Sequence, residues 1–366
     1  MASEAEMLAS VKSLAQEFPQ LSFGECRDSL EELYQRVKAC EDDLTPDLCK
    51  GLLTLVLSVI AKRCADNRPL QFFSLEIVAC IGRSIGKNEE AANKQDLIAF
   101  FFKLGKKEVK SQRMWKPKVM VPMLQYILAF TKAVKLQKVL SEEALNFDAM
   151  GALMQALYGE MGRCEMWPMR WRWKASKALA KVFKTSPRLL EHAITVMKKE
   201  EPPALLVEAV GSCLDQESSH RPALQEMYLK YVLEAKQPAS DYTLDAWGSI
   251  VSLMQPEEFE KQFLPVAVRM VKRQPAAIAQ SMPALVKHIK INLAPYVKEI
   301  LDPLAVEINK VQERRIAGRA FVRHVVQKSD DPAAPLTVAE SWAEALKKAG
   351  KTDEKQAMLL GLAALI

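Results

Sequence analysis

The sequence predicts an all-α fold of the solenoid class, in which helix pairs stack on one another. Only 13 of the 366 residues are glycine, and the dominant residues Ala, Leu, Lys, Glu and Met lose little side-chain freedom in a helix. Four segments of about 40 residues near the C-terminus each have the pattern of two helices joined by a short break, as in HEAT and armadillo repeats. We therefore expect about 8–9 stacked helix pairs, whose extended surface suits large partners.

Residues 1–104 are expected to form N-terminal helical repeats with an acidic balance. The predicted helices cover about 3–17, 25–40, 46–64, 70–85 and 90–104. Thr45 and Pro46 form a helix start, because Thr accepts a hydrogen bond as the N-cap and Pro needs no N–H at the first helical position. The apolar run from Leu52 to Ala61 reaches about half of a membrane span, so we interpret it as a buried helix.

A basic loop is expected at 105–118, and basic, Trp-containing helical repeats are expected at 119–215. The predicted helices of the second segment cover about 119–139, 142–158, 167–184, 187–199 and 203–215. Ser186 and Pro187 repeat the helix start of Thr45 and Pro46. Long loops in compact arrays are commonly functional or disordered, so the loop is a candidate contact segment.

Residues 216–366 are expected to form the regular HEAT-type pairs. Their first helices open near Ser219, Glu257, Leu293 and Leu336, and the partner helices open near Ser240, Pro275, Val311 and Thr352. Pro265 and Pro303 fall at equivalent places in two of these units, which predicts a shared kinked helix. The chain is apolar from Met358 to Ile366, whereas a solenoid needs a polar cap, so we expect the array to continue beyond residue 366.

The positive charge is concentrated in one band. Residues 1–100 carry a formal charge of −5, residues 101–190 carry +12 and residues 191–366 carry −1, which together give the net charge of +6. Lys and Arg supply the charge that nucleic-acid phosphates attract, so the band predicts contact with RNA. The candidate ribosome- or RNA-binding residues are Lys103, Lys106, Lys107, Lys110, Arg113, Lys116, Lys118, Arg170, Arg172 and Lys174.

Four of the six tryptophans lie in the same band, and two interpretations of three of them stay open. Trp167, Trp171 and Trp173 alternate with arginines, so they could offer stacking faces to bases. Their spacing is also that of residues buried in a helix core, with the neighbouring Arg side chains solvated or stacked on them.

The sequence offers no group of nucleophile, base and orienting residue, so we do not expect an enzyme. The four histidines have no metal-site spacing, and no glycine-rich phosphate loop is present, so no metal, cofactor or small-molecule substrate is expected. The seven cysteines include no CxxC pair, which favours reduced thiols in a cytosolic or nuclear protein. The acidic N-terminus is unlike a signal peptide, and no membrane contact is expected.

Three stretches, 179–194, 228–238 and 258–275, resemble the N-terminal HEAT-repeat region of the general-control translational activator. This resemblance implies a cytoplasmic, ribosome-associated scaffold that senses stalled or collided ribosomes in amino-acid starvation. Its expected partners are rRNA and ribosomal proteins. The family also activates the kinase of the initiation factor 2 alpha subunit, through regions that these residues do not include. The alternative is a HEAT scaffold of the transport-receptor or phosphatase type, which binds proteins without contacting nucleic acid.

Overall fold

Every regular element that the computed structural model describes is helical, which confirms the all-α fold. The structure describes residues 4–63, 67–87, 91–111, 117–136, 147–214, 218–233, 241–252, 254–265, 291–292, 294–296, 323–328, 331 and 333–348. The chain divides into two compact units, Met1–Cys213 and Leu214–Ile366, which are described separately below. Of the finer division expected from the sequence, segments 1–104, 119–215 and 216–366 stay a prediction, whereas residues 105–111 of the expected loop at 105–118 are helical.

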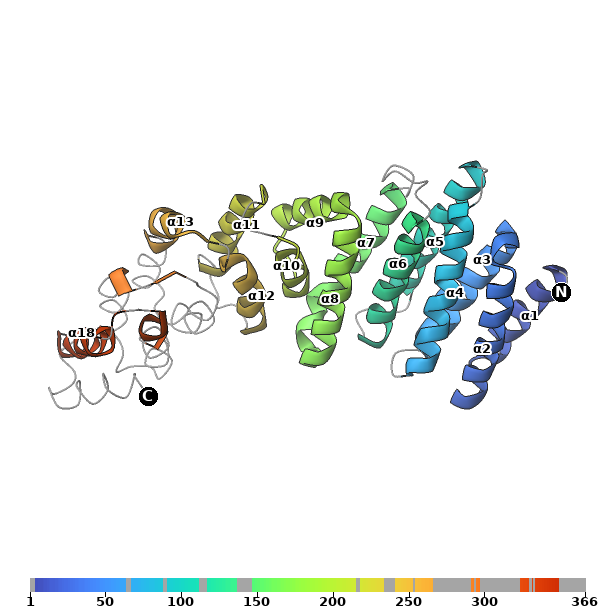
Figure 1. Ribbon diagram of the computed structural model, residues 1–366, viewed down its shortest axis with the longest axis horizontal. Coiled ribbons are helices and arrows are strands. Elements are labelled where there is room, and N and C mark those ends of the chain that lie inside the picture. The colour runs from blue at the N-terminus through green and yellow to red at the C-terminus, as the bar shows by residue number, and fades with distance from the viewer. Residues whose placement is uncertain are drawn as a thin grey trace. The chain divides into compact units, whose positions relative to one another are not determined.

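The first unit contains one α-helix for each helix that the sequence predicts between residues 3 and 215. In chain order these are α1 (Glu4–Glu17), α2 (Phe23–Ala39), α3 (Pro46–Thr54), α4 (Arg68–Lys87), α5 (Ala91–Ser111), α6 (Pro117–Leu136), α7 (Phe147–Met161), α8 (Met169–Thr185), α9 (Pro187–Lys199) and α10 (Ala204–Gly211). Figure 1 shows them side by side in chain order, from α1 near the N-terminus to α10.

These helices form the two layers of a solenoid. In one layer α1, α3, α5, α7 and α9 each pack against the next member, and in the other layer α2, α4, α6, α8 and α10 do the same. Successive helices of each layer therefore bury each other's apolar faces, as in stacked helix pairs. The solenoid class is confirmed, and the expected number of 8–9 pairs along the whole chain stays a prediction.

The predicted side-chain cap forms at the helix start of Thr45 and Pro46 but not at that of Ser186 and Pro187. The hydroxyl of Thr45 accepts a hydrogen bond from the backbone N–H of Leu48 at 3.4 Å, with Pro46 at the first position of α3. Ser186 makes no side-chain cap to α9. This residue is buried because it ends α8 as well, where its own N–H donates to the carbonyl oxygens of Val182 and Phe183.

The apolar run from Leu52 to Ala61 is a buried helical segment, as the sequence predicts. After α3 the helix widens into a π-turn at Leu55–Val59 and tightens into a 3₁₀ turn at Ile60–Lys62. Leu52, Leu57 and Ile60 are fully buried in the first unit. Among the described residues, no helix is both long enough and apolar enough to cross a membrane.

The second unit contains the described part of the regular pairs. Its elements are α11 (Arg221–Tyr228), a π-turn at Leu229–Leu233, α12 (Asp241–Val251), α13 (Pro256–Glu258), a π-turn at Phe259–Phe263, a 3₁₀ turn at Ala294–Tyr296, a helix at 323–328 and α18 (Ala334–Lys348). Four of the predicted helix starts thus agree within two residues with α11, α12, α13 and α18. The starts predicted near Leu293, Pro275, Val311 and Thr352 lie outside the described residues.

The predicted kink at Pro265 has a local counterpart in the second unit. Pro265 lacks the N–H that would close an α-helical turn, and the π-turn Phe259–Phe263 lies directly before it. Phe259 and Phe263 are buried and stack with ring centroids 5.0 Å apart, as the predicted apolar stripe requires. Pro303 lies outside the described residues, so a shared kink stays a prediction.

One ion pair joins two elements of this unit. Arg221 at the start of α11 donates from Nη1 to Glu258 Oε2 of α13 at 2.6 Å. The same carboxylate accepts from the backbone N–H of Gln255 at 3.0 Å, in a capping box that starts α13. Glu258 therefore fixes the start of one helix and its contact with another.

Candidate functional site

Three lysines of the predicted basic loop, Lys106, Lys107 and Lys110, lie on a helix. α5 continues to Ser111, so the prediction of a loop is wrong for residues 105–111, and α6 already includes residues 117 and 118. Lys103, Lys107 and Lys110 are exposed, and Lys106 is half-buried. At 100° per residue, the three exposed lysines fall within about 60° of the helix circumference. They form one positive stripe, called here the α5 lysine face.

Gly105 explains why the sequence pattern was misleading. It is buried where α5 meets α7, and a Cβ at this position would lie 3.0 Å from Cδ2 of Leu153. Phe101 and Val109, one turn on either side, are also buried. The glycine therefore permits a close approach between two helices, whereas the Gly-Lys-Lys sequence is more typical of a break.

One of the remaining candidates of this segment lies within the described residues. Arg113 and Lys116 lie outside the described residues, and Lys118 belongs to the first turn of α6. Within α5, the carboxylate of the buried Glu108 accepts a hydrogen bond from the hydroxyl of Ser58 at 2.8 Å. This acid faces inward, so it lies away from the exposed lysines of the same helix.

The three tryptophans near the start of α8 divide between the core and the surface interpretations. Trp167 and Trp171 are buried and belong to the core. Trp173 is 55% exposed, and Nζ of Lys177 lies 4.5 Å from the centroid of its ring. On a helix, residue 173 points about 200° away from residue 171, which accounts for the difference. The core interpretation holds for two of the three residues.

The candidate cations of α8 surround these rings. Arg170 and Lys174 are exposed and lie over the ring of the buried Trp171, at 5.5 Å and 4.9 Å from its centroid. Arg172 is half-buried. Such cation–π contacts hold the long side chains against the helix while their charges remain at the surface.

The structure separates the two basic clusters that the sequence places in one band. α5 packs against α3 and α7 in one layer of the solenoid, and α8 packs against α6 and α10 in the other. The solvent-facing sides of helices in opposite layers point in different directions. The α5 lysine face and the cations of α8 (Arg170, Arg172 and Lys174) therefore belong to two surfaces, each of which can have its own partner.

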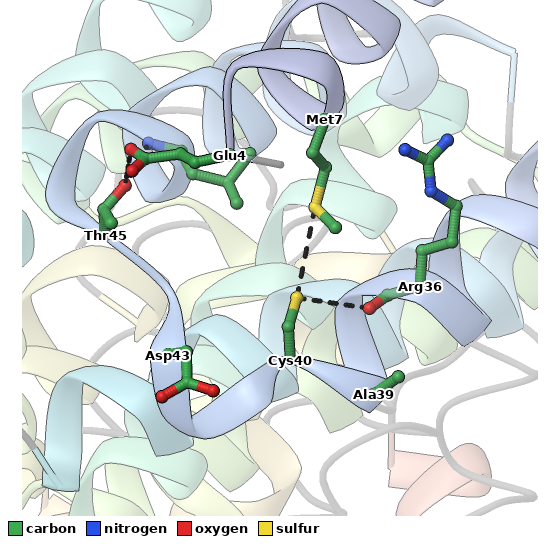
Figure 2. Close-up of a pocket in the computed structure, with 8 residues that line it drawn as sticks. Glu4, Met7, Arg36, Ala39, Cys40, Asp43 and Thr45 are labelled. Atoms are coloured by element: carbon green, nitrogen blue, oxygen red, sulfur yellow. Dashed lines mark hydrogen bonds between the residues drawn. The ribbon is translucent and has the colours of Figure 1, made fainter. Parts of the chain in front are cut away.

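A pocket of about 330 Å³ lies near the start of the chain, between α1, the end of α2 and the start of α3. Figure 2 shows the thiol of Cys40 at its centre. This thiol lies 3.2 Å from the carbonyl oxygen of Arg36 and 4.0 Å from Sδ of Met7. Burial raises the pKa of Cys40, so the thiol stays protonated and is a poor nucleophile. The hydrogen bond between Thr45 and Glu4 closes another side of the pocket.

Several other thiols of the first unit are also buried. Cys26, Cys49 and Cys80 are buried, and Cys64 lies outside the described residues. Burial raises the pKa of Cys49 and of Cys80 to about 12. In the part of the chain that is described, no three His, Cys, Asp or Glu side chains gather as metal ligands would.

Comparison with known proteins finds relatives for part of this chain. Residues 221–352 match the family described as "Stalled ribosome sensor GCN1 N-terminal". The stalled ribosome sensors GCN1 of Mus musculus and Homo sapiens are each 26% identical over 171 residues, which cover 44% of this chain and 6% of the relative. Protein ILITYHIA of Arabidopsis thaliana is 27% identical over 108 residues, 29% of this chain and 4% of the relative.

The chain thus matches only a small part of the length of these relatives. The matched family segment lies within the second unit, while both basic clusters lie in the first. The resemblance predicted from the sequence is confirmed: over residues 221–352 this chain is similar to the N-terminal region of the stalled ribosome sensor GCN1 family.

Proposed function

We propose that the chain is the N-terminal scaffold part of a ribosome-associated sensor of stalled or collided ribosomes. The match of residues 221–352 to the sensor family supports this function, because the matched relatives are described as stalled ribosome sensors. The stacked helix pairs support it too, since a solenoid presents an extended surface to a large partner. In the full-length protein this role is cytoplasmic and leads to activation of the initiation factor 2 alpha kinase, through regions outside these residues.

The α5 lysine face is the proposed contact with ribosomal RNA. Lys103, Lys107 and Lys110 present three charges on one side of a helix, with the neighbouring Glu108 turned inward. Each phosphate that a lysine neutralises releases bound counterions, so the affinity falls as the salt concentration rises. Three such contacts account for a slope of about −2 to −3 in a plot of log affinity against log salt.

Cosedimentation with purified ribosomes over a series of salt concentrations tests this contact. We expect the variant Lys103→Glu/Lys107→Glu/Lys110→Glu to pellet less than the parent chain at low salt. Its residual binding should depend on salt with a slope that is smaller by about 2–3. The three side chains are exposed, so circular dichroism should show an unchanged helix content.

A matched control separates a local contact from a general effect of charge. Lys12, Lys62 and Lys199 are also exposed but lie on separate elements. Reversing these three charges changes the net charge by the same amount and should leave pelleting close to that of the parent. Equal losses in both triple variants would contradict a specific α5 contact. A parent chain that stays in the supernatant at low salt would favour a protein-binding scaffold of the transport-receptor or phosphatase type.

A further inference from the structure

The start of α8 exposes an apolar cluster that the proposed RNA contact does not use. Met166 is 89% exposed, Met169 is 78% exposed and Trp173 is 55% exposed. Met169 and Trp173 are four residues apart in α8 and so share one side of that helix, and Met166 ends the 3₁₀ turn Gly162–Met166 just before it. Half of the strongly exposed large hydrophobic residues in the described parts of the chain lie in this one cluster.

The residues between and after the exposed ones are well packed. Trp167 and Trp171 of this stretch of chain are buried, and Cys164 in the 3₁₀ turn is fully buried. Further along α8 Ala175 and Leu179 are buried as well, and the helix packs against α6 and α10. The exposed methionines and tryptophan are therefore not the loose end of a poorly packed helix. A contiguous exposed apolar cluster on a packed helix commonly marks a binding surface.

The sequence around the cluster is almost entirely basic. Residues 161–190 include eight Lys and Arg residues and one acid, and α8 itself contains six basic residues and no acid. The exposed cations nearest to the cluster in sequence are Arg163, Arg170, Lys174 and Lys177. Like charges one turn apart on a helix repel each other. Arg170 also opposes the positive end of the helix dipole, and Pro168 supplies no side-chain cap. An acidic partner would relieve both effects.

An acidic segment of protein fits this surface better than RNA does. Methionine side chains are flexible and polarisable, and they adapt to the apolar side chains of a peptide. RNA would offer phosphates and base faces, but Trp173 is the one exposed aromatic ring of the cluster, and Lys177 already lies against that ring. Met166 and Met169 would gain little from a sugar–phosphate backbone. Apolar anchors flanked by carboxylates would satisfy both the thioethers and the cations.

We propose that Met166, Met169 and Trp173, with Arg170 and Lys174 beside them, form a docking site for a short acidic peptide segment with large apolar anchor residues. The site lies in the opposite layer from the α5 lysine face and does not depend on it. The chain would therefore hold two partners of different chemistry: nucleic-acid phosphate on α5 and an acidic, apolar protein segment on α8.

Fluorescence anisotropy with labelled 12-residue peptides tests the proposal on the 366-residue chain. The first probe alternates Asp or Glu with Leu and Phe, the second replaces each Leu and Phe by Ser, and the third is a single-stranded RNA of matched length. We expect the first probe to bind at least about tenfold more tightly than the second, and we expect RNA binding to be unchanged in Trp173→Ala. Trp173→Ala should weaken its binding at least about tenfold, because exposed aromatic anchors dominate such contacts. Arg170→Gln/Lys174→Gln should weaken it and reduce its dependence on salt.

Two control variants make the outcome decisive. Leu336→Ala removes a large apolar side chain of similar exposure from the second unit and should leave peptide binding unchanged. The α5 triple charge reversal should also leave it unchanged, so a failure here is distinguishable from a failure of the proposed ribosome contact. Equal binding of the first two peptides would overturn the proposal, since charge alone would then explain the affinity. RNA binding that is tighter than peptide binding and is lost in Trp173→Ala would overturn it as well.

Discussion

The close approach of α4 and α6 makes Gly82 a sensitive position in the solenoid. A Cβ at residue 82 would lie 2.7 Å from Cβ of Ala133 and 3.2 Å from the carbonyl oxygen of Phe130. Contacts between carbon atoms are normally about 3.5–4.0 Å, so the two helices would have to separate by a large fraction of an ångström. Overpacking of this kind costs about 1–3 kcal/mol.

The variant Gly159→Ala provides the matched control. Gly159 lies in α7, and nothing would contact a Cβ there within 4 Å. Both substitutions replace a helical glycine by alanine, which by itself stabilises a helix by about 0.5–1 kcal/mol. Because this gain is common to both, the difference between the two variants isolates the overpacking cost. Gly159→Ala should be more stable than Gly82→Ala by about 1–3 kcal/mol.

Native-state hydrogen exchange measured by mass spectrometry reports this difference locally, without assuming that the whole solenoid unfolds in one step. Each kcal/mol corresponds to about a fivefold change in the opening equilibrium. Relative to the parent chain, peptides from α4 and α6 in Gly82→Ala should therefore exchange about 5- to 150-fold faster than peptides from α7 do in Gly159→Ala. Equal exchange in the two variants would show that α4 and α6 do not approach as closely as the structure indicates.

Three further predictions concern local interactions of the first unit. Ser22→Ala removes a capping box with Glu25 and should destabilise α2 by about 1 kcal/mol. Hydrogen exchange of the first amides of α2 should then be faster, and unchanged exchange would contradict the capping role. Hydrogen bonds from Arg83 lower the pKa of Glu41 in the folded protein. Their contribution to the free energy of unfolding is therefore present above the unfolded pKa of about 4.3, and it is lost as the pH falls through the folded pKa. In denaturant titrations, Glu41→Gln should therefore be less stable than the parent near pH 7, and the gap should close below about pH 4; a gap that does not depend on pH would exclude the ion pair as its cause. Buried Cys49 should react with iodoacetamide near pH 8 only after unfolding, and rapid labelling of the native chain, detected by peptide mass spectrometry, would refute its burial.

The spacing of apolar residues predicts most of the first unit, because a helix must place them on one side to bury them. Leu52 and Leu57 are buried as their run implies, and Thr45 caps α3 as its position before Pro46 implies. Gly105 shows the limit of such reasoning. Its meaning depends on the side chain of Leu153 on a neighbouring helix, which is 48 residues away and invisible to a local pattern.

The candidate sites show the same division between local and tertiary information. Helical spacing alone places Trp173 on the opposite side from Trp171, so the exposed ring could have been identified from the sequence. The same spacing would have drawn attention to Met169, one turn before Trp173, although methionines are common in cores and attract little notice. By contrast, no local pattern reveals that α5 and α8 lie in opposite layers, since this depends on which helices stack.

A density map of the chain bound to a pair of stalled ribosomes tests the central claim most directly, because it shows which surface touches which component. The account predicts that Lys103, Lys107 and Lys110 lie against rRNA phosphates. It also predicts that Met166, Met169 and Trp173 face either solvent or an acidic protein segment. A map in which the α5 lysine face points into solvent while another part of the chain contacts the ribosome would contradict it.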